Sequence, residues 1–271
     1  MASTFQYGAQ VRANGIRQHY LRYGGKGPVL VVVPGIVTPA AVWDFVGQRL
    51  GRDFDTYLLD VRGRGLSEAG PGLDYGLDAC ANDVTAFAAA LGFERYALLG
   101  HSMGARIAIR AARRAGTALE RIVLVDPPVS GPGRRPYPSR LPPLLDLLHA
   151  AYRGEAYAAL KGPGVAPWPE ALLRVRAQWL PTCHEPAVVA AHRGFHDDDV
   201  HADLPHIAIP MALIAATRGD VIRDEDADEL LALAPGLRIR RVPDAGHQIP
   251  IDNFEGFFAA LDEVLPRGQA A

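Results

Sequence analysis

The stretch "YALLGHSMGARIAIRAA", residues 96–112, passes from a continuous apolar run to a segment in which apolar residues recur at helical intervals. It therefore predicts a buried strand, a tight turn and an amphipathic helix. The turn holds Ser102, with Gly100 and Gly104 two residues to either side. This arrangement fits a nucleophile elbow, a bend so sharp that side chains at the glycine positions would collide with neighbouring backbone. The bend would lift the serine hydroxyl above the sheet edge, at a helix N-terminus that stabilises developing negative charge.

The same alternation of strand and helix patterns continues on both sides of this stretch. Apolar runs typical of strands buried on both faces cover residues 28–34, 55–61, 95–101, 121–127, 210–216 and 237–243. Helical spacing covers residues 40–50, 78–91, 104–115, 226–234 and 254–265. Residues 5–25 read as a hairpin at the sheet edge. We therefore expect an α/β fold with a mainly parallel, eight-stranded sheet and helices on both faces.

Residues 127–205 interrupt this alternation. They contain no strand-like run, and they open with a Pro/Gly-rich segment, residues 127–143, that favours extended and turn conformations. Helical patches follow at residues 140–152, 169–180 and 185–196. The pattern predicts a core built from residues 1–126 and 206–271, and a helical cap of residues 127–205 inserted after the sixth strand.

Composition narrows the possible partners. The 271 residues are 49% hydrophobic with a formal net charge of −2, and the isoelectric point lies near 6.5. This balance favours a small-molecule substrate over nucleic acid or an anionic membrane. The N-terminus lacks the pattern of a signal peptide, and no apolar run is long enough to cross a bilayer, so we expect a cytoplasmic location. The two cysteines, Cys80 and Cys183, are too few and too far apart for a disulfide framework, so we expect free thiols.

A serine hydroxyl needs a base to remove its proton, so the elbow requires a histidine on a loop at the same sheet edge. Of the nine histidines, His247 lies in "DAGHQIP", between the last predicted strand and the last predicted helix. His101 adjoins the serine in sequence but should point away from it. We expect His247 to be the base.

The base in turn needs an acid that fixes its tautomer. Asp126 ends one predicted strand and Asp220 follows the next, and both precede His247 in the chain. Aspartates at strand ends are also common turn formers. The residues alone leave Asp126 and Asp220 as equal candidates.

The reaction also needs an oxyanion hole, a pair of hydrogen-bond donors that stabilises the negative oxygen of the intermediate, and backbone amides can supply it. We expect the N–H of Met103, directly after the serine, and the N–H of Ile36, in the loop "PGIVT", to be its two donors. This chemistry requires no cofactor and no metal.

Four strings, "GHSMG", "DVRGRGLS", "VPGIVTPA" and "DAGHQIP", resemble the α/β-hydrolase superfamily, and the likeness covers essentially the whole chain. The superfamily commonly has His-Gly where this chain has Pro34 and Gly35. Because the donor is the following amide, this difference should leave the oxyanion hole in place.

Three further strings, "ANGIRQHYLRYGG", "DTYLLDVRGRGLS" and "VLVDPPVSGPGRR", resemble the N-formylmaleamate deformylases of bacterial nicotinate degradation. That resemblance implies a serine hydrolase that converts N-formylmaleamate to maleamate and formate. It also favours Asp126 as the acid, since those deformylases carry theirs in a Val-Asp-Pro-Pro string. Asp220 remains the alternative, because most superfamily members place the acid one strand later. The alternative function is a related hydrolase of small carboxylated esters, amides or C–C bonds.

A carboxylated substrate implies a cation or several hydrogen-bond donors in the site. The candidates are Arg62, Arg64, Arg134 and Arg135, and the sequence assigns none of them. Two other functions compete with hydrolysis. His192 and His196, four residues apart and next to Asp197–Asp199, could ligate a metal, although the Glu of a His-Glu-x-x-His pattern is missing. A non-catalytic binding protein could also use the same fold.

Overall fold

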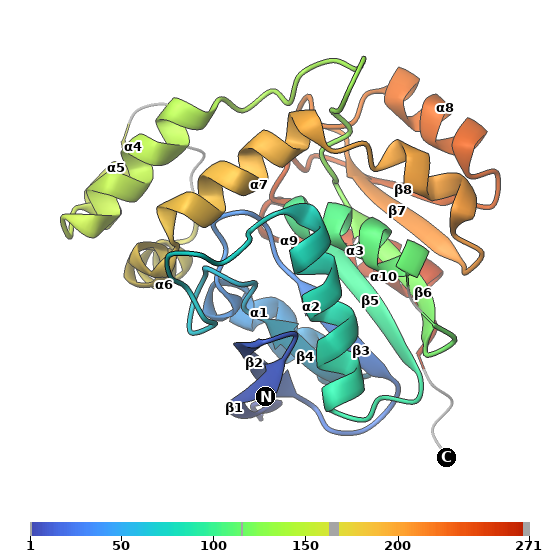
Figure 1. Ribbon diagram of the computed structural model, residues 1–271, viewed down its shortest axis with the longest axis horizontal. Coiled ribbons are helices and arrows are strands. Elements are labelled where there is room, and N and C mark those ends of the chain that lie inside the picture. Colours follow the sequence, from blue (N-terminus) through green and yellow to red (C-terminus); the bar gives the residue numbers. More distant parts are fainter. Residues whose placement is uncertain (1, 115, 163–167, 268–271) are drawn as a thin grey trace.

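The computed structural model describes residues 2–114, 116–162 and 168–267, and an eight-stranded sheet lies at its centre (Figure 1). The strands are β1 (Phe5–Ala13), β2 (Ile16–Tyr23), β3 (Val29–Val33), β4 (Asp55–Leu59), β5 (Tyr96–His101), β6 (Leu119–Val125), β7 (Met211–Ala216) and β8 (Arg238–Val242). Their order across the sheet is β1-β2-β4-β3-β5-β6-β7-β8. The pairs β1–β2 and β2–β4 are antiparallel, and all others are parallel. The predicted mainly parallel sheet and its edge hairpin are confirmed.

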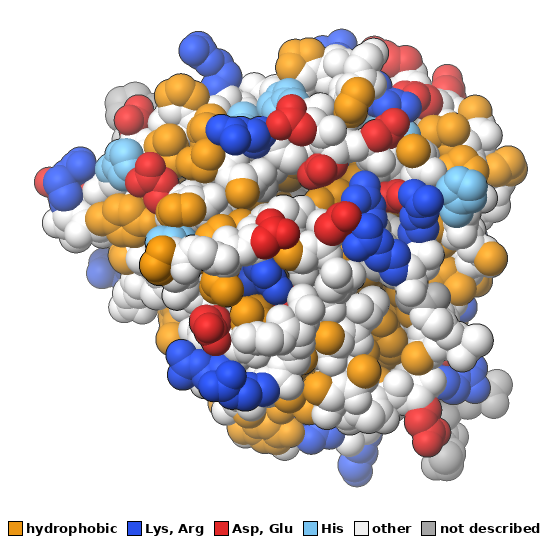
Figure 2. Space-filling model, viewed as in Figure 1, with side chains coloured by type: hydrophobic (Ala, Val, Ile, Leu, Met, Phe, Trp, Pro, Cys, Tyr) orange, Lys and Arg blue, Asp and Glu red, His pale blue; other side chains and the backbone are white. Residues whose placement is uncertain are grey.

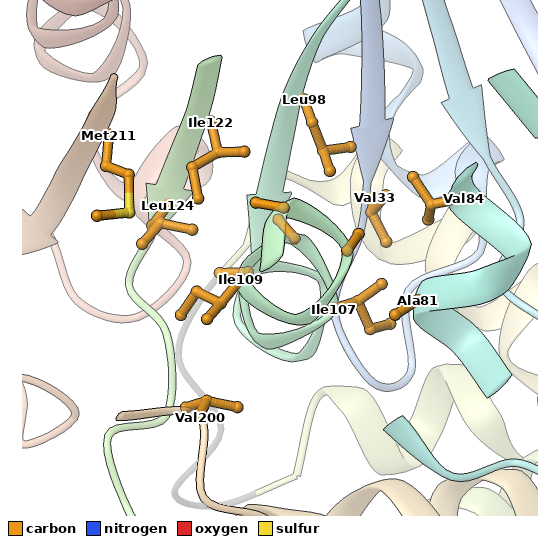
Figure 3. Packing of buried hydrophobic residues seen from close by; sticks show 14 of the residues in the cluster. Val33, Ala81, Val84, Leu98, Ile107, Ile109, Ile122, Leu124, Val200 and Met211 are labelled. Atoms are coloured by element: carbon orange, nitrogen blue, oxygen red, sulfur yellow. The ribbon is translucent and has the colours of Figure 1, made fainter. Parts of the chain in front are cut away.

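The central strands bury both faces, which explains their continuous apolar sequences. In β3, Val31 and Val33 belong to one hydrophobic cluster, while Leu30 and Val32 belong to another on the opposite face. Figure 3 shows part of the first cluster, in which Ile107 of the helix after β5 points toward Ala81 and Ile109 extends from the other side of the same helix. Each fully buried aliphatic side chain of this kind contributes about 1.5–3 kcal/mol to folding.

Helices cover both faces of the sheet. The helices packed on the first cluster are α2 (Leu77–Ala90), α3 (Met103–Arg114) and α8 (Asp224–Leu233). The other face carries η1 (Ala40–Trp43), α1 (Asp44–Leu50), α9 (Ile249–Asp252) and α10 (Phe254–Val264). The helix predicted at residues 40–50 is thus a 3-10 turn followed by a short α-helix, and α9 was not predicted.

A long insertion separates β6 from β7. Its elements are α4 (Leu141–Tyr152), α5 (Ala156–Leu160), α6 (Glu170–Trp179), η2 (Leu180–Thr182), α7 (Glu185–Asp197) and η3 (His201–His206). We call α4–α7 the inserted helices. Leu148 of α4 and Val188 of α7 form a small hydrophobic cluster with Val37, which lies in the loop after β3. The inserted helices therefore pack over the loops at the carboxyl ends of the parallel strands (Figure 1).

One buried arginine ties both ends of the insertion to α3. Arg106, one turn after Ser102, is 1% exposed and donates hydrogen bonds to four backbone carbonyls. The acceptors and distances are Pro128 (2.8 Å), Ser130 (2.9 Å), Gly194 (2.9 Å) and Asp198 (2.7 Å). Burial lowers the pKa of Arg106 to about 10, so it stays charged at neutral pH. The first and last segments of the insertion are thereby held at one point on the core.

The distribution of surface charge and the state of the two cysteines match the expectations from composition. Basic and acidic side chains are interspersed across the face shown in Figure 2. No helix within the described residues is long and apolar enough to span a membrane. Cys80 and Cys183 are both buried and free, as predicted.

Candidate active site

The turn after β5 has the strained geometry that its glycines predict. Ser102 has φ +53°, a left-handed conformation that a residue with a side chain rarely adopts. A Cβ on Gly104 would lie 1.9 Å from the Val33 carbonyl oxygen, and one on Gly100 would lie 2.2 Å from the Gly104 carbonyl oxygen. Only glycine fits at either position, because backbone cannot move aside as a flexible side chain can. The Ser102 amide donates to the Val125 carbonyl at 2.8 Å, which fixes the turn against β6.

Three side chains from separate loops meet at this turn. His247 Nε2 lies 2.9 Å from Ser102 Oγ, and His247 Nδ1 lies 2.7 Å from Asp126 Oδ2. A carboxylate can only accept a hydrogen bond, so Nδ1 carries the proton. Nε2 is therefore the acceptor for the Ser102 hydroxyl, the tautomer that a general base requires.

The structure places Asp126, and not Asp220, beside His247. Asp126 follows the last residue of β6, is 1% exposed, and has φ +45°. Its second oxygen, Oδ1, accepts from the Ala216 amide at 3.1 Å. Asp220 lies on an exposed loop, where its Oδ2 accepts from Arg223 Nη2 at 2.8 Å, and this hydrogen bond lowers its pKa.

The loop that carries His247 is fixed by contacts on both sides. The Gly246 amide donates to Asp252 Oδ2 at 2.7 Å, and the Arg218 amide donates to the Ala245 carbonyl at 2.8 Å. Asp244, three residues before the histidine, has φ +56°. The imidazole is thus positioned by its own backbone as well as by Asp126.

His101 holds the loop that carries His247 in place, a role that the sequence reasoning missed. As expected, it does not bond to Ser102: its Nε2 donates to the His247 carbonyl oxygen at 2.9 Å. Its ring lies between Trp43 and His247, with centroid separations of 5.0 Å to each. Burial lowers the pKa of His101 to about 3, and Nδ1 has no hydrogen-bond partner among the described residues. The neutral His101 ring therefore positions the His247 backbone through this hydrogen bond.

The loop after β3 brings backbone amides close to Ser102. A Cβ on Gly35 would lie 3.5 Å from the Ser102 Cβ, so the two segments are in contact. The Gly35 carbonyl accepts from the Thr38 amide at 3.2 Å, which orients the peptide that carries the Ile36 N–H. The Ile36 carbonyl accepts from Arg64 Nε at 2.8 Å. Within the described part of the chain, neither the Ile36 nor the Met103 amide donates a hydrogen bond, so both are available to an oxyanion.

Ser102 and His247 open into a cavity of about 530 Å³ between the core loops and the inserted helices. Its walls combine Ile36 and Val37 from the core with Leu144, Leu147 and Phe195 from the insertion. The Tyr137 hydroxyl lies 3.4 Å from His247 Nε2. Burial raises the pKa of Tyr137 to about 12, so it stays a hydrogen-bond donor beside the base. Sequence reasoning missed Tyr137, which lies in the Pro/Gly-rich start of the insertion without a helical or strand pattern.

The four arginines that sequence reasoning proposed for a substrate carboxylate all have protein partners. Arg62 pairs with Asp83, Arg134 with Glu229 and Arg135 with Asp226. Arg64 is 1% exposed and donates to backbone carbonyls, including Ala187 at 3.0 Å. None of the four lines the cavity at Ser102.

The possible metal ligands are not gathered into a site. His192 Nε2 lies 2.8 Å from the Ser139 carbonyl, and His196 Nδ1 lies 3.2 Å from the His192 carbonyl. Across residues 2–114, 116–162 and 168–267, no group of three or more His, Cys, Asp or Glu side chains is arranged to hold a metal ion. The metal hypothesis therefore gains no support from the geometry.

The sequence and the fold match known proteins over nearly their whole length. The N-formylmaleamate deformylase of Pseudomonas putida KT2440 is 56% identical over 263 residues, which cover 97% of this chain and 98% of the relative. The crystal structure of a serine-to-alanine variant of the N-formylmaleamic acid deformylase from Pseudomonas putida S16 matches with a TM-score of 0.89 at 46% identity. That match covers 94% of this chain and 100% of the other.

A more distant relative also matches in sequence. The 2-(acetamidomethylene)succinate hydrolase of Mesorhizobium japonicum is 25% identical over 240 residues, which cover 84% of each chain. The model of the alpha/beta hydrolase family matches residues 30–261, from β3 to α10. With its sheet order, its strained serine turn and this match, the chain belongs to the alpha/beta hydrolase family.

Proposed function

We propose that the protein is a serine hydrolase that removes the formyl group of N-formylmaleamate, releasing maleamate and formate. The observation that carries the proposal is the pair of hydrogen bonds that connects Ser102 through His247 to Asp126. The protein that contains them is 56% identical to an N-formylmaleamate deformylase. In this proposal Ser102 is the nucleophile, His247 the general base and acid, and Asp126 the residue that holds the imidazole tautomer.

The first half-reaction transfers the formyl group to the enzyme. His247 Nε2 takes the Ser102 proton while Oγ attacks the formyl carbon, and the carbonyl oxygen becomes an oxyanion. The amides of Met103 and Ile36 donate to that oxyanion, and each such donor is worth about 3 kcal/mol of transition-state stabilisation. The C–N bond then breaks, and His247 gives its proton to the departing nitrogen.

The chemistry of the leaving group suits this machinery. The nitrogen lies between two carbonyl groups, so its negative charge is delocalised onto the second carbonyl as the bond breaks. It therefore departs more easily than the nitrogen of an ordinary amide. In the second half-reaction His247 deprotonates a water molecule, which attacks the formyl ester on Ser102. The bond between the formyl carbon and Ser102 Oγ then breaks, His247 returns the proton to Oγ, and formate leaves.

We assign residues 127–205 to a cap that closes over the reacting groups. Support comes from the cavity walls, which the inserted helices share with the core loops, and from Tyr137, which brings a hydroxyl of the insertion to His247. A closed site excludes bulk water and strengthens the electrostatic contacts at the oxyanion. The substrate's own carboxylate would lie within this closed space, where it requires a cation or several donors.

A formate-release assay tests the proposal. Purified protein is incubated with N-formylmaleamate, and formate is measured beside the hydrolysis of a simple aryl ester. Ser102→Ala should reduce turnover of both substrates by at least 10³-fold. Ser139→Ala is the matched control, because this serine also lines the cavity and makes no hydrogen bond to His247 within the described residues, and it should retain activity within a few-fold. Absence of formate release by the unmodified protein would refute the deformylase assignment. Ester hydrolysis that survives Ser102→Ala would refute the nucleophile.

A further inference from the structure

One cation of the cavity wall has no assigned role. Arg176 of α6 lines the same cavity as Ser102 and His247. Its guanidinium carbon lies over the Trp168 ring, 4.4 Å from the centroid, a cation–π contact. This contact uses none of the guanidinium N–H groups, which can therefore donate to a ligand.

Arg176 differs from its neighbours in having no charge partner. Within the described residues its guanidinium makes no hydrogen bond and no ion pair, whereas Arg174, two residues earlier, pairs with Glu170 at 2.7 Å. The lining of the cavity contains no Asp or Glu among the residues that the structure describes. Arg176 also borders an adjoining cavity of about 340 Å³ with Asp146, and these two side chains form no ion pair.

The charge of Arg176 is therefore uncompensated inside the site. Burial lowers its pKa to about 10, so the group remains protonated at neutral pH. A partly desolvated, unpaired cation costs folding free energy, and an anionic ligand would recover that cost. Arg140 is the second arginine of the lining, but it is exposed, where an ion pair is worth little.

We propose that Arg176, stacked on Trp168, binds the carboxylate of the substrate and so makes the enzyme selective for N-formyl amides that carry an anionic group away from the scissile bond. This inference rests on the proposed function for the identity of the substrate. The Arg176 guanidinium can donate to both carboxylate oxygens at once, which fixes the orientation of the substrate as well as its position. With the carboxylate held at α6, the formyl group at the other end of the molecule is presented to Ser102, and the cis double bond between them limits its freedom.

The test compares a charged and a neutral substrate. The probes are N-formylmaleamate and the analogue in which a methyl group replaces the carboxylate, (Z)-N-formylbut-2-enamide. Arg176→Met should lower kcat/KM for N-formylmaleamate by about 10- to 100-fold, mainly through a higher KM. The preference for the charged over the neutral substrate should fall at least tenfold, and Arg176→Lys should restore part of it. Arg140→Met is the comparator and should change this preference by less than threefold.

A second measurement separates failure of this inference from failure of the proposed function. Hydrolysis of p-nitrophenyl acetate reports on Ser102 without requiring a carboxylate, and added maleamate should inhibit it competitively. Arg176→Met should raise the inhibition constant of maleamate at least tenfold, even if N-formylmaleamate proves not to be the substrate. An unchanged inhibition constant and an unchanged substrate preference in a folded Arg176→Met protein would overturn the inference. So would a larger effect from Arg140→Met.

Discussion

Replacing Asp126 by asparagine should inactivate the enzyme, although the two side chains have nearly the same size and shape. The carboxylate has two tasks: Oδ1 accepts from the Ala216 amide at 3.1 Å, and Oδ2 accepts from His247 Nδ1 at 2.7 Å. Asparagine offers one oxygen and one NH₂ group for these two donors. If its oxygen faces Ala216, the NH₂ group faces His247 and can only donate to Nδ1. The ring must then carry its proton on Nε2, where it cannot accept the proton of Ser102.

The size of the effect follows from this change of tautomer. The loss should be about 10⁴-fold in kcat, as is typical when the triad acid of a serine protease is changed to asparagine, and this corresponds to about 5.4 kcal/mol of transition-state stabilisation. The opposite amide orientation would restore the bond to His247, but it would leave the buried Ala216 amide facing an NH₂ group. That arrangement costs about 1–3 kcal/mol of stability.

The assay is formate release under saturating substrate, with circular dichroism and thermal unfolding to show that each variant is folded. Asp220→Asn is the control, because its carboxylate is exposed and paired with Arg223, and it should retain kcat within about twofold. More than a tenth of the activity remaining in Asp126→Asn would refute the assignment. A larger loss in Asp220→Asn would move the acid to the next strand.

Three further predictions test the support of the site. Because burial lowers the pKa of His101 to about 3, the unfolded chain takes up a proton at this residue first as the pH falls below about 6.5. Stability is therefore lost toward acid, and between pH 6.5 and 4.5 urea unfolding should show about 2.3 kcal/mol more loss in the native protein than in His101→Gln; equal losses would contradict the burial argument. Gly104→Ala should destabilise by about 3 kcal/mol or more, or prevent folding, since its Cβ would overlap the Val33 carbonyl, whereas Gly70→Ala has open space and should be near neutral in thermal unfolding. Tyr137→Phe should lower kcat/KM for formate release by up to about tenfold through loss of the hydroxyl beside His247; an unchanged value would show that only the ring matters.

The sequence was sufficient for the sheet and for the positions of Ser102 and His247. Continuous apolar runs identify strands buried on both faces, and the spacing of Gly100 and Gly104 identifies a turn that only glycine permits. These are local signals, set by backbone sterics and burial, and they can be read without knowing the partners of any residue. The fold follows from them because parallel strands require crossover helices.

The residue pattern alone did not separate the two aspartates; the resemblance favoured Asp126, and the structure places its carboxylate beside His247. Both follow strands that are neighbours in the sheet, so the pattern of residues gives them equal standing. The difference is one of distance along the chain and of backbone conformation: Asp126 directly follows β6 with φ +45°, while Asp220 lies four residues beyond the end of β7.

The cation of the cavity could not be identified from sequence for another reason. Arg62, Arg64, Arg134 and Arg135 lie close to recognisable motifs, yet each is neutralised or bound by groups distant in sequence. Arg176 lies in an ordinary amphipathic helix with no motif around it. Whether an arginine is available to a ligand depends on its partners in space, and helical periodicity carries no information about them.

The four hydrogen bonds from Arg106 to backbone carbonyls of the insertion limit which parts of the molecule can rearrange when substrate enters. Because one side chain binds carbonyls at the beginning and at the end of the insertion, the base of that segment cannot swing away from α3 without exposing a buried charge. Widening of the entrance must take place farther out, in α4–α6. The outer helices can therefore diverge in sequence during evolution, and so accept molecules of new shape, while the groups that break the bond keep their relative positions.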